Sequence, residues 1–238
     1  MSNTFFKFKQ FIIHQDKCAM KVTTDSCLFG SLLPVTNSIN VLDIGTGTGL
    51  LALMYAQKNP KSNIDAIEID ATAASQAKEN AVASPWSNKI NIIAADAKHF
   101  QFTKKYHLIF SNPPFYENEM SGNDDKRNKA HHDDGLKLVE VLQLIKNNMD
   151  NSGKFYLLLP YKRKEEIINL LAQQKLAIEK LLFVRQSSSH SYFRMIIQGC
   201  HLPNAPKEVE FEEISIKDRN ENYTQEFTSL LKDYYLKL

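Results

Sequence analysis

Cysteine is scarce in this chain. Cys18, Cys27 and Cys200 occur among 238 residues, and their spacing matches no zinc-binding pattern. An odd number of widely separated cysteines excludes a disulfide framework and is typical of a reducing compartment. We therefore expect the three cysteines to be core residues.

The chain also lacks a long hydrophobic run. Its longest apolar stretches, such as 155–160, are far shorter than the roughly 20 residues that a membrane-spanning helix needs. The first residues contain no basic segment followed by an apolar stretch and a cleavage site, so no secretory signal is predicted. We expect a cytoplasmic protein without a membrane span.

Neither sign of charge dominates, since 29 basic and 27 acidic residues give a net charge of +2. This balance neither requires nor excludes a polyanionic partner. The length, with 43% hydrophobic and 24% charged residues, is that of an ordinary globular protein, and one domain is the default. Local basic clusters could form a phosphate-binding rim: Lys7, Lys9, Lys17, Lys21, Lys126, Arg127, Lys129, Lys162, Arg163, Lys164, Arg185 and Arg194.

Segments with strand character alternate with segments of helical character. Apolar stripes and turn residues predict strands at 39–44, 63–69, 89–95, 106–111, 154–159, 176–186 and 192–200, and helices at 50–58, 71–83, 136–149 and 162–173. Ser152-Gly153 is expected to break the chain before the fifth strand. The pattern predicts an α/β fold with a seven-stranded, mostly parallel sheet, helices on both faces and an antiparallel C-terminal strand pair.

A glycine-rich turn follows the first predicted strand. Gly45, Gly47 and Gly49 stand between Asp43 and Leu50, where the backbone can approach a ligand without interference from a Cβ atom. A dinucleotide-binding fingerprint would place its third glycine at position 50, so Leu50 weakens that interpretation. The segment does not match a P-loop either.

Carboxylates end the next two predicted strands. Glu68 is placed to accept hydrogen bonds from a ribose diol, with Asp70 beside it, and Asp96 could meet an adenine amino group. Each acid alone is more often a surface carboxylate, but the ordered set describes a pocket for a nucleoside with an amino-acid tail, S-adenosyl-L-methionine. The predicted cofactor-binding residues of this core are Asp43, Gly45, Thr46, Gly47, Gly49, Glu68, Asp70, Asp96, Ala97 and Asn112.

The fourth predicted strand ends in Asn112-Pro113-Pro114-Phe115. The two prolines cannot continue a central strand, so a stiff turn holds the Asn112 amide and the Pro113 carbonyl as two acceptors. Phe115 adds a stacking face. Ligands bind doubly wound sheets where the strand order reverses, between the first and fourth strands, so a methyl donor would face a planar amino group here.

These motifs resemble those of a known family. D-x-G-x-G-x-G followed by N-P-P-F is similar to the Rossmann-like class I amino-methyltransferases, which methylate adenine N6, cytosine N4 or a protein glutamine amide. The segments 8–11, 19–25, 84–86, 223–227 and 232–236 extend the resemblance to the bacterial methyltransferases that modify adenine N6 in tRNA(Val), next to the 3′ side of the anticodon. Nearly the whole chain is covered.

The resemblance implies further features. Lys21, Thr24 and Asp25 would contact the cofactor, and Gly30 would close their turn. Ser26-Cys27 replaces an expected glycine and aliphatic residue. Phe115 replaces the commoner tyrosine, so it can still stack but cannot donate a hydrogen bond from a hydroxyl. The chain would be one methyltransferase domain with an N-terminal extension (1–38), a core (39–200) and a C-terminal extension (201–238).

Several alternatives stay open. A protein glutamine methyltransferase would use the same motif, although that family carries an N-terminal helical substrate domain that forty residues cannot supply. A non-catalytic nucleic-acid-binding module is the third possibility. The segment 117–135 could fold over substrate, and its acidic and histidine residues 131–134 lack the spacing of a metal site. We expect a monomer that binds the anticodon arm of tRNA and uses no metal.

Overall fold

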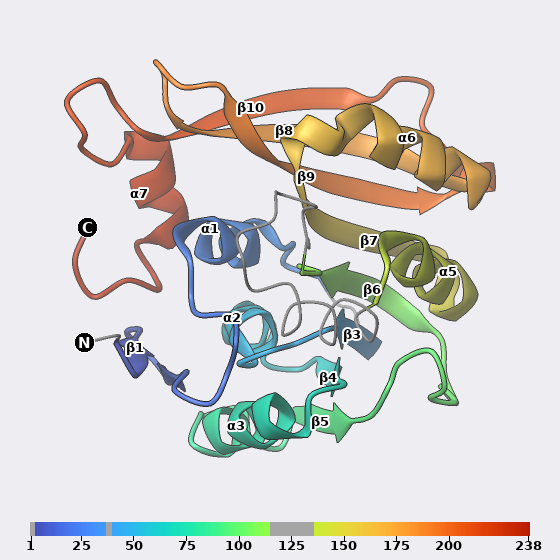
Figure 1. Cartoon of the computed structure of the whole chain (residues 1–238), viewed down its shortest axis with the longest axis horizontal. Coiled ribbons are helices and arrows are strands. Elements are labelled where there is room, and N and C mark those ends of the chain that lie inside the picture. The colour runs from blue at the N-terminus through green and yellow to red at the C-terminus, as the bar shows by residue number, and fades with distance from the viewer. Residues whose placement is uncertain (1–2, 37–39, 115–135) are drawn as a thin grey trace, which may run out of the picture.

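The computed structural model describes residues 3–36, 40–114 and 136–238, and an eight-stranded sheet forms its centre (Figure 1). Its strands are β3 (Asn40–Ile44), β4 (Asn63–Glu68), β5 (Ile90–Ala94), β6 (Tyr106–Ser111), β7 (Met149–Pro160), β8 (Leu176–Ser187), β9 (Tyr192–His201) and β10 (Glu210–Lys217). Their spatial order is β10-β8-β9-β7-β6-β3-β4-β5. The order reverses beside β3, as the sequence predicts.

Strand directions confirm a mostly parallel sheet. The five strands from β5 to β7 are parallel, and β9 is antiparallel to both of its neighbours, β7 and β8. The predicted count of seven strands is wrong, because β10 adds an eighth strand parallel to β8. Half of the residues of this edge strand are charged, and it buries only Ile214 and Ile216, so its sequence lacks the apolar signal of a central strand.

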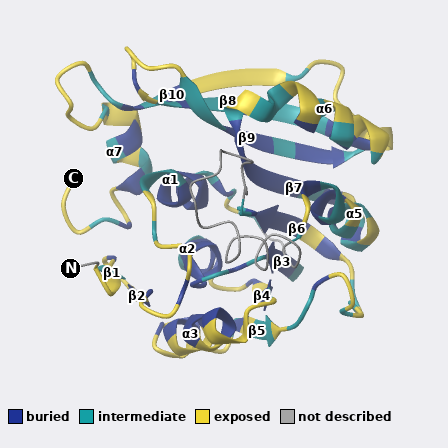
Figure 2. Cartoon of the chain, viewed as in Figure 1, coloured by how far each residue is buried: buried dark blue, intermediate teal, exposed yellow. Residues whose placement is uncertain are grey.

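Helices cover both faces of the sheet. They are α1 (Thr24–Leu32), α2 (Leu50–Lys58), α3 (Ala71–Val82), α5 (Leu138–Asn148), α6 (Lys164–Gln173) and α7 (Gln225–Leu231), with short 3₁₀ turns η1 (Tyr161–Arg163) and η2 (Leu202–Asn204). One core lies under α1, α2 and α7, and a second lies under α5 and α6. Figure 2 shows the buried central strands and the exposed outer sides of α3 and α6.

The start of β7 differs from the prediction. Helix α5 buries its expected stripe but ends at Asn148, and β7 begins at once with Met149, so Ser152-Gly153 lies inside the strand. The pairing shifts between Tyr106 opposite Met149 and Leu108 opposite Lys154. A bulge therefore takes up the extra residues, which explains why a turn-like dipeptide does not end the strand.

The two ends of the chain meet on one side of the molecule (Figure 1). Strands β1 (Phe5–Lys7) and β2 (Ile12–His14) form a hairpin, and the Lys9 amide donates to the Tyr234 carbonyl oxygen at 2.8 Å. All three cysteines are free and buried, as expected. Among the described residues, no helix combines the length and apolar character needed to cross a membrane.

Candidate functional site

The glycine-rich turn leaves an open space beside the end of β3. Gly45, Gly47 and Gly49 have φ values of +71°, +55° and +82°. Residues other than glycine rarely adopt this left-handed backbone region. A Cβ at Gly45 or Gly47 would meet no atom within 4 Å. Gly49 then begins α2 as its N-cap residue. A ligand can therefore lie directly against this backbone, near the amino end of a helix.

Asp43 supports the turn from below and is wholly buried. Its Oδ2 accepts a hydrogen bond from the Thr46 hydroxyl at 2.6 Å, whereas Oδ1 finds no hydrogen-bond partner among the described residues, although the Ala52 amide is near. Burial raises the pKa of the Asp43 carboxyl to about 7, and the nearby Glu68 raises it further, while the Thr46 hydroxyl partly opposes this. The Asp43 carboxyl is thus enclosed at the base of the turn, where the Thr46 hydroxyl holds it.

Glu68 closes the second side of the space. Its Oε2 accepts from the Gly47 amide at 2.8 Å, and its Oε1 accepts from the Asp70 amide at 3.1 Å. Asp70 itself caps α3, because its Oδ1 accepts from the Thr72 and Ala73 amides, both at 2.8 Å. Glu68 is therefore fixed against the turn, and Asp70 has a structural role at the helix start.

Asp96 and Ala97 follow β5, near the end of β4 that carries Glu68. The Ala95 amide donates to the Glu68 carbonyl at 2.9 Å, which joins this turn to the end of β4. Asp96 Oδ1 accepts from the Lys98 amide at 2.9 Å, and its other oxygen lies 3.8 Å from His99 Nε2. Ala97 is buried. Asp96 is partly exposed and belongs to the same edge of the sheet as Glu68.

Asn112 stands opposite the glycine turn. Ser111, the last residue of β6, pairs with Ile44, and its hydroxyl donates to the Ile44 carbonyl at 2.6 Å. Asn112 and Gly45 are therefore next to each other at the carboxyl ends of adjacent strands, as predicted. Asn112 is half-buried, Pro113 is buried and Pro114 is half-buried. Phe115 and the segment 117–135 lie outside the described residues.

The N-terminal segment leads into α1, whose first turn is capped by side chains. Thr23 is the N-cap, and Ser26 accepts from the Thr23 amide at 3.1 Å, so the serine that replaces an expected glycine completes a capping box. Lys21 is exposed, and Thr24 and Asp25 form the first turn of the helix. Asp25 Oδ2 accepts from Arg194 Nε at 2.8 Å, which ties α1 to β9.

Gly30 does not close a turn, contrary to the prediction. It lies inside α1, where a Cβ would come within 2.5 Å of the Met54 sulfur on α2. A larger residue at position 30 would therefore require the Met54 side chain to move.

Two buried amides of α3 bind the N-terminal segment, and one of them also reaches the glycine turn. Asn80 Nδ2 donates to the carbonyls of His14 and Thr48, both at 2.9 Å, and its Oδ1 accepts from the His14 amide. Gln76 accepts from the Lys17 amide at 3.0 Å. Neither role is predicted from the sequence, although two amides spaced four apart in an alanine-rich helix are a usable signal.

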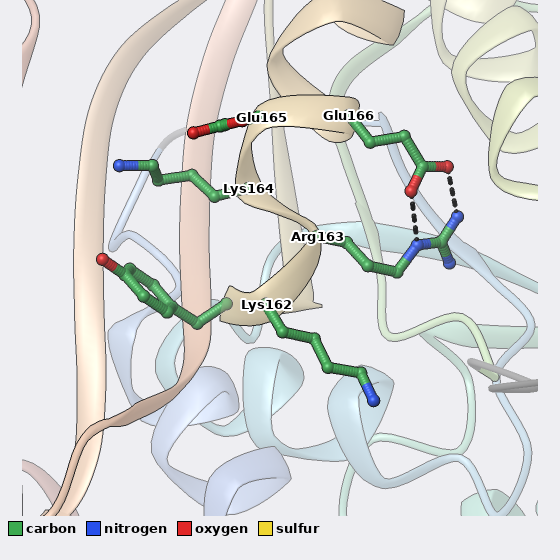
Figure 3. A pocket seen from close by; sticks show the side chains of 6 residues that line it. Lys162, Arg163, Lys164, Glu165 and Glu166 are labelled. Carbon is green, nitrogen blue, oxygen red and sulfur yellow. Dashed lines mark hydrogen bonds and ion pairs between the residues drawn. The ribbon is translucent and has the colours of Figure 1, made fainter. Parts of the chain in front are cut away.

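A basic turn follows β7 at the same sheet edge. Residues 161–166 line an open hollow of about 490 Å³. In Figure 3, Lys164 and Glu165 extend to one side, and Arg163 pairs with Glu166 on the other. This is one of the basic clusters that the sequence assigns to a phosphate-binding rim. This turn lies near the end of β6, because Ser111 of β6 pairs with Leu157 of β7.

Comparisons with known proteins agree with this geometry. The family model "Methyltransferase small domain" matches residues 18–128. Proteins named tRNA1(Val) (adenine(37)-N6)-methyltransferase from Bacteroides fragilis and Cytophaga hutchinsonii are each 37% identical over the full length of both chains. The one from Pseudoalteromonas translucida is 34% identical over 98% of this chain and 99% of its own.

Solved structures show the same fold. A predicted O-methyltransferase from Agrobacterium tumefaciens superposes with a TM-score of 0.69 at 15% identity, covering 88% of this chain and 96% of that chain. A ribosomal protein L11 methylase from Lactobacillus delbrueckii superposes with a TM-score of 0.54 at 17% identity, covering 79% and 83%. At these identities the likeness concerns the arrangement of strands and helices.

Proposed function

Because the chain belongs to the family of tRNA1(Val) (adenine(37)-N6)-methyltransferases, we propose that it transfers a methyl group from S-adenosyl-L-methionine to an adenine N6 in tRNA. The target would be the adenosine next to the 3′ side of the anticodon in a valine tRNA. The observation that carries the proposal is the pairing of Ile44 with Ser111, which brings the glycine turn and Asn112 to one point of the sheet edge.

The residues around the glycine turn fit the proposed cofactor. The space beside Gly45 and Gly47 admits a ligand, and the buried Asp43 holds the turn beneath it through the Thr46 hydroxyl. Glu68 would hold the ribose, Asp96 would meet the adenine amino group, and Lys21, Thr24 and Asp25 would contact the methionine end. When bound, S-adenosyl-L-methionine supplies an electrophilic sulfonium methyl group.

Asn112 and Pro113 would prepare the acceptor. The lone pair of an aromatic amine is delocalised into the ring, so N6 is a poor nucleophile. Asn112 Oδ1 and the Pro113 carbonyl would accept its two hydrogens, favour sp³ character and aim the lone pair at the methyl group. The surplus proton leaves to solvent after transfer, because an amide is not a base. Phe115 would stack on the adenine.

A tRNA loop suits this site better than a duplex. An adenosine in a loop is already unstacked or easily splayed out, so its entry costs less free energy than extrusion from double-stranded DNA. We propose that the chain acts as a monomeric, single-domain cytoplasmic enzyme on the anticodon arm, without a metal.

Incubation with labelled S-adenosyl-L-methionine tests the proposal. Total tRNA, a peptide release factor and DNA are offered separately, and digested RNA is analysed by nucleoside mass spectrometry. We expect label in tRNA alone, recovered as N6-methyladenosine. Label in the release factor would establish a glutamine methyltransferase instead, and no label in any substrate would favour a binding module without catalysis.

A further inference from the structure

Three aromatic rings pack against one another at the ends of β7, β8 and β9. Tyr161 of η1 lies 5.3 Å from Phe183 and 5.2 Å from Tyr192 between ring centroids, and Phe183 and Tyr192 are 5.4 Å apart. All three side chains remain partly exposed to solvent. We call these three residues the aromatic platform.

Cations lie over the aromatic platform. Lys164 Nζ is 5.7 Å from the Tyr161 ring centre and 5.8 Å from that of Phe183, and the Arg185 guanidinium lies 5.5 Å from that of Tyr192. Glu213 of β10 accepts from Arg185 at 3.0 Å and from the Tyr192 hydroxyl. The rings are thus held in place from two sides while part of their surface stays open.

The aromatic platform lies near the carboxyl ends of the parallel strands, on the same side of the sheet as Asn112. Ser111 pairs with Leu157 on the neighbouring strand, and Tyr161 follows four residues later (161 − 157). At about 3.3 Å per residue, this is roughly 13 Å beyond the end of β6. The hollow at 161–166 opens beside it (Figure 3). A nucleotide next to an adenosine at Asn112 would be within reach of rings at this distance.

We propose that the aromatic platform stacks an unpaired base of the tRNA loop that flanks the adenosine at Asn112. This rests on the proposed function. Phe183 also packs on the second core, so a purely structural role would account for that ring. Tyr161 and Tyr192 flank Phe183 with partly exposed rings, at the end of the sheet that also holds Asn112.

The local charges favour stacking over phosphate attraction. Four cations (Lys162, Arg163, Lys164 and Arg185) stand near three acids (Glu165, Glu166 and Glu213), and two of these acids already pair with Arg163 and Arg185. A nearly neutral surface gains little from counterion release, whereas an aromatic face accepts any base. Single-stranded RNA is therefore the partner that this surface fits best.

The test compares Tyr161→Leu and Tyr192→Leu with the wild type. Tyr223→Leu serves as the matched control, because Tyr223 is a 42% exposed tyrosine in the C-terminal segment. We expect each platform variant to raise the KM for tRNA about tenfold, which corresponds to ~1.4 kcal/mol, with little change in kcat or in the cofactor Kd. Tyr161→Phe and Tyr192→Phe should retain wild-type KM values, since a ring is kept.

A second measurement separates stacking from a general loss of structure. Binding of an anticodon stem-loop RNA is followed by fluorescence anisotropy, with each loop nucleotide in turn made abasic. One abasic position should weaken binding to the wild type about tenfold but leave binding to Tyr161→Leu unchanged. The salt dependence of binding should be the same for both proteins.

Failure of this inference differs from failure of the proposed function. If the wild type methylates tRNA and the platform variants keep its KM and its sensitivity to every abasic site, the platform does not bind RNA. If the variants keep the wild-type KM but elute at a different volume in size-exclusion chromatography, the platform is a contact between protein molecules. That result also overturns the inference. If the wild type methylates no tRNA, the proposed function itself fails.

Discussion

At the scale of single residues, Asp43 carries an unusual ionisation state. Its folded-state pKa of about 7 lies above its usual value of 3.8, mainly because the carboxyl is buried. Between these values the folded chain holds a proton that the unfolded chain has released. The resulting stabilisation is complete below about pH 4 and is lost as the pH rises through about 7.

Replacing Asp43 with asparagine should remove this pH dependence. We expect the free energy of unfolding of Asp43→Asn to rise relative to the wild type between about pH 5 and about pH 8, by the order of a few kcal/mol. Urea denaturation without cofactor at both pH values measures it. A difference between the two proteins that is equal at both pH values would contradict a raised Asp43 pKa.

Site residues could be predicted from the sequence where their place at the end of a strand or in a glycine turn defines them. Gly45, Gly47 and the acids at strand ends follow from strand, turn and helix order alone. Ser26 departs from the family pattern, and only the structure shows that it completes the capping box of α1. Arg194 was assigned to a basic cluster, because a long-range bond to Asp25 leaves no local trace in the sequence.

At the scale of elements, α3 fixes the N-terminal segment to the glycine turn. Asn80 is 1% exposed and bonds both His14 and Thr48. In Asn80→Ala, buried backbone groups lose their partners, which should cost about 2–3 kcal/mol of stability. The glycine turn should also lose support, so we expect the Kd for S-adenosyl-L-methionine to rise about tenfold in calorimetry.

Glu79→Ala on the same helix provides the control. Glu79 pairs with Lys17 at 3.0 Å, but both side chains are about half exposed, so their interaction contributes little. Calorimetry should give this variant the cofactor affinity of the wild type. Equal affinities for Asn80→Ala and Glu79→Ala would show that the amide does not support the cofactor site.

Elements with strong apolar patterns were predicted well, and elements held by distant contacts were not. Helix α5 buries the four residues of its stripe, Leu138, Val141, Leu142 and Ile145. Strands β1, β2 and β10 have no such pattern, since they are short or highly charged and are stabilised by pairing. The predicted fold class was therefore right while the strand count was wrong.

At the scale of the whole molecule, the two ends of the chain support one side of the sheet. Phe8 bridges to Tyr235, and the Tyr234 hydroxyl donates to the Met54 carbonyl of α2 at 3.1 Å. Helix α2 begins at the glycine turn, so a contact between residues 180 positions apart in the sequence supports the helix that starts at the proposed cofactor site. A single-sequence pattern cannot reveal such contacts.

The central claim is that Asn112 and the glycine turn together perform methyl transfer to adenine N6. Single-turnover transfer to a valine tRNA at saturating cofactor tests it in Asn112→Ala, with Asn63→Ala at the exposed opposite end of β4 as control. We predict a loss of about 100- to 1,000-fold for Asn112→Ala and wild-type rates for Asn63→Ala. A folded Asn112→Ala protein that forms N6-methyladenosine at the wild-type rate would contradict the account.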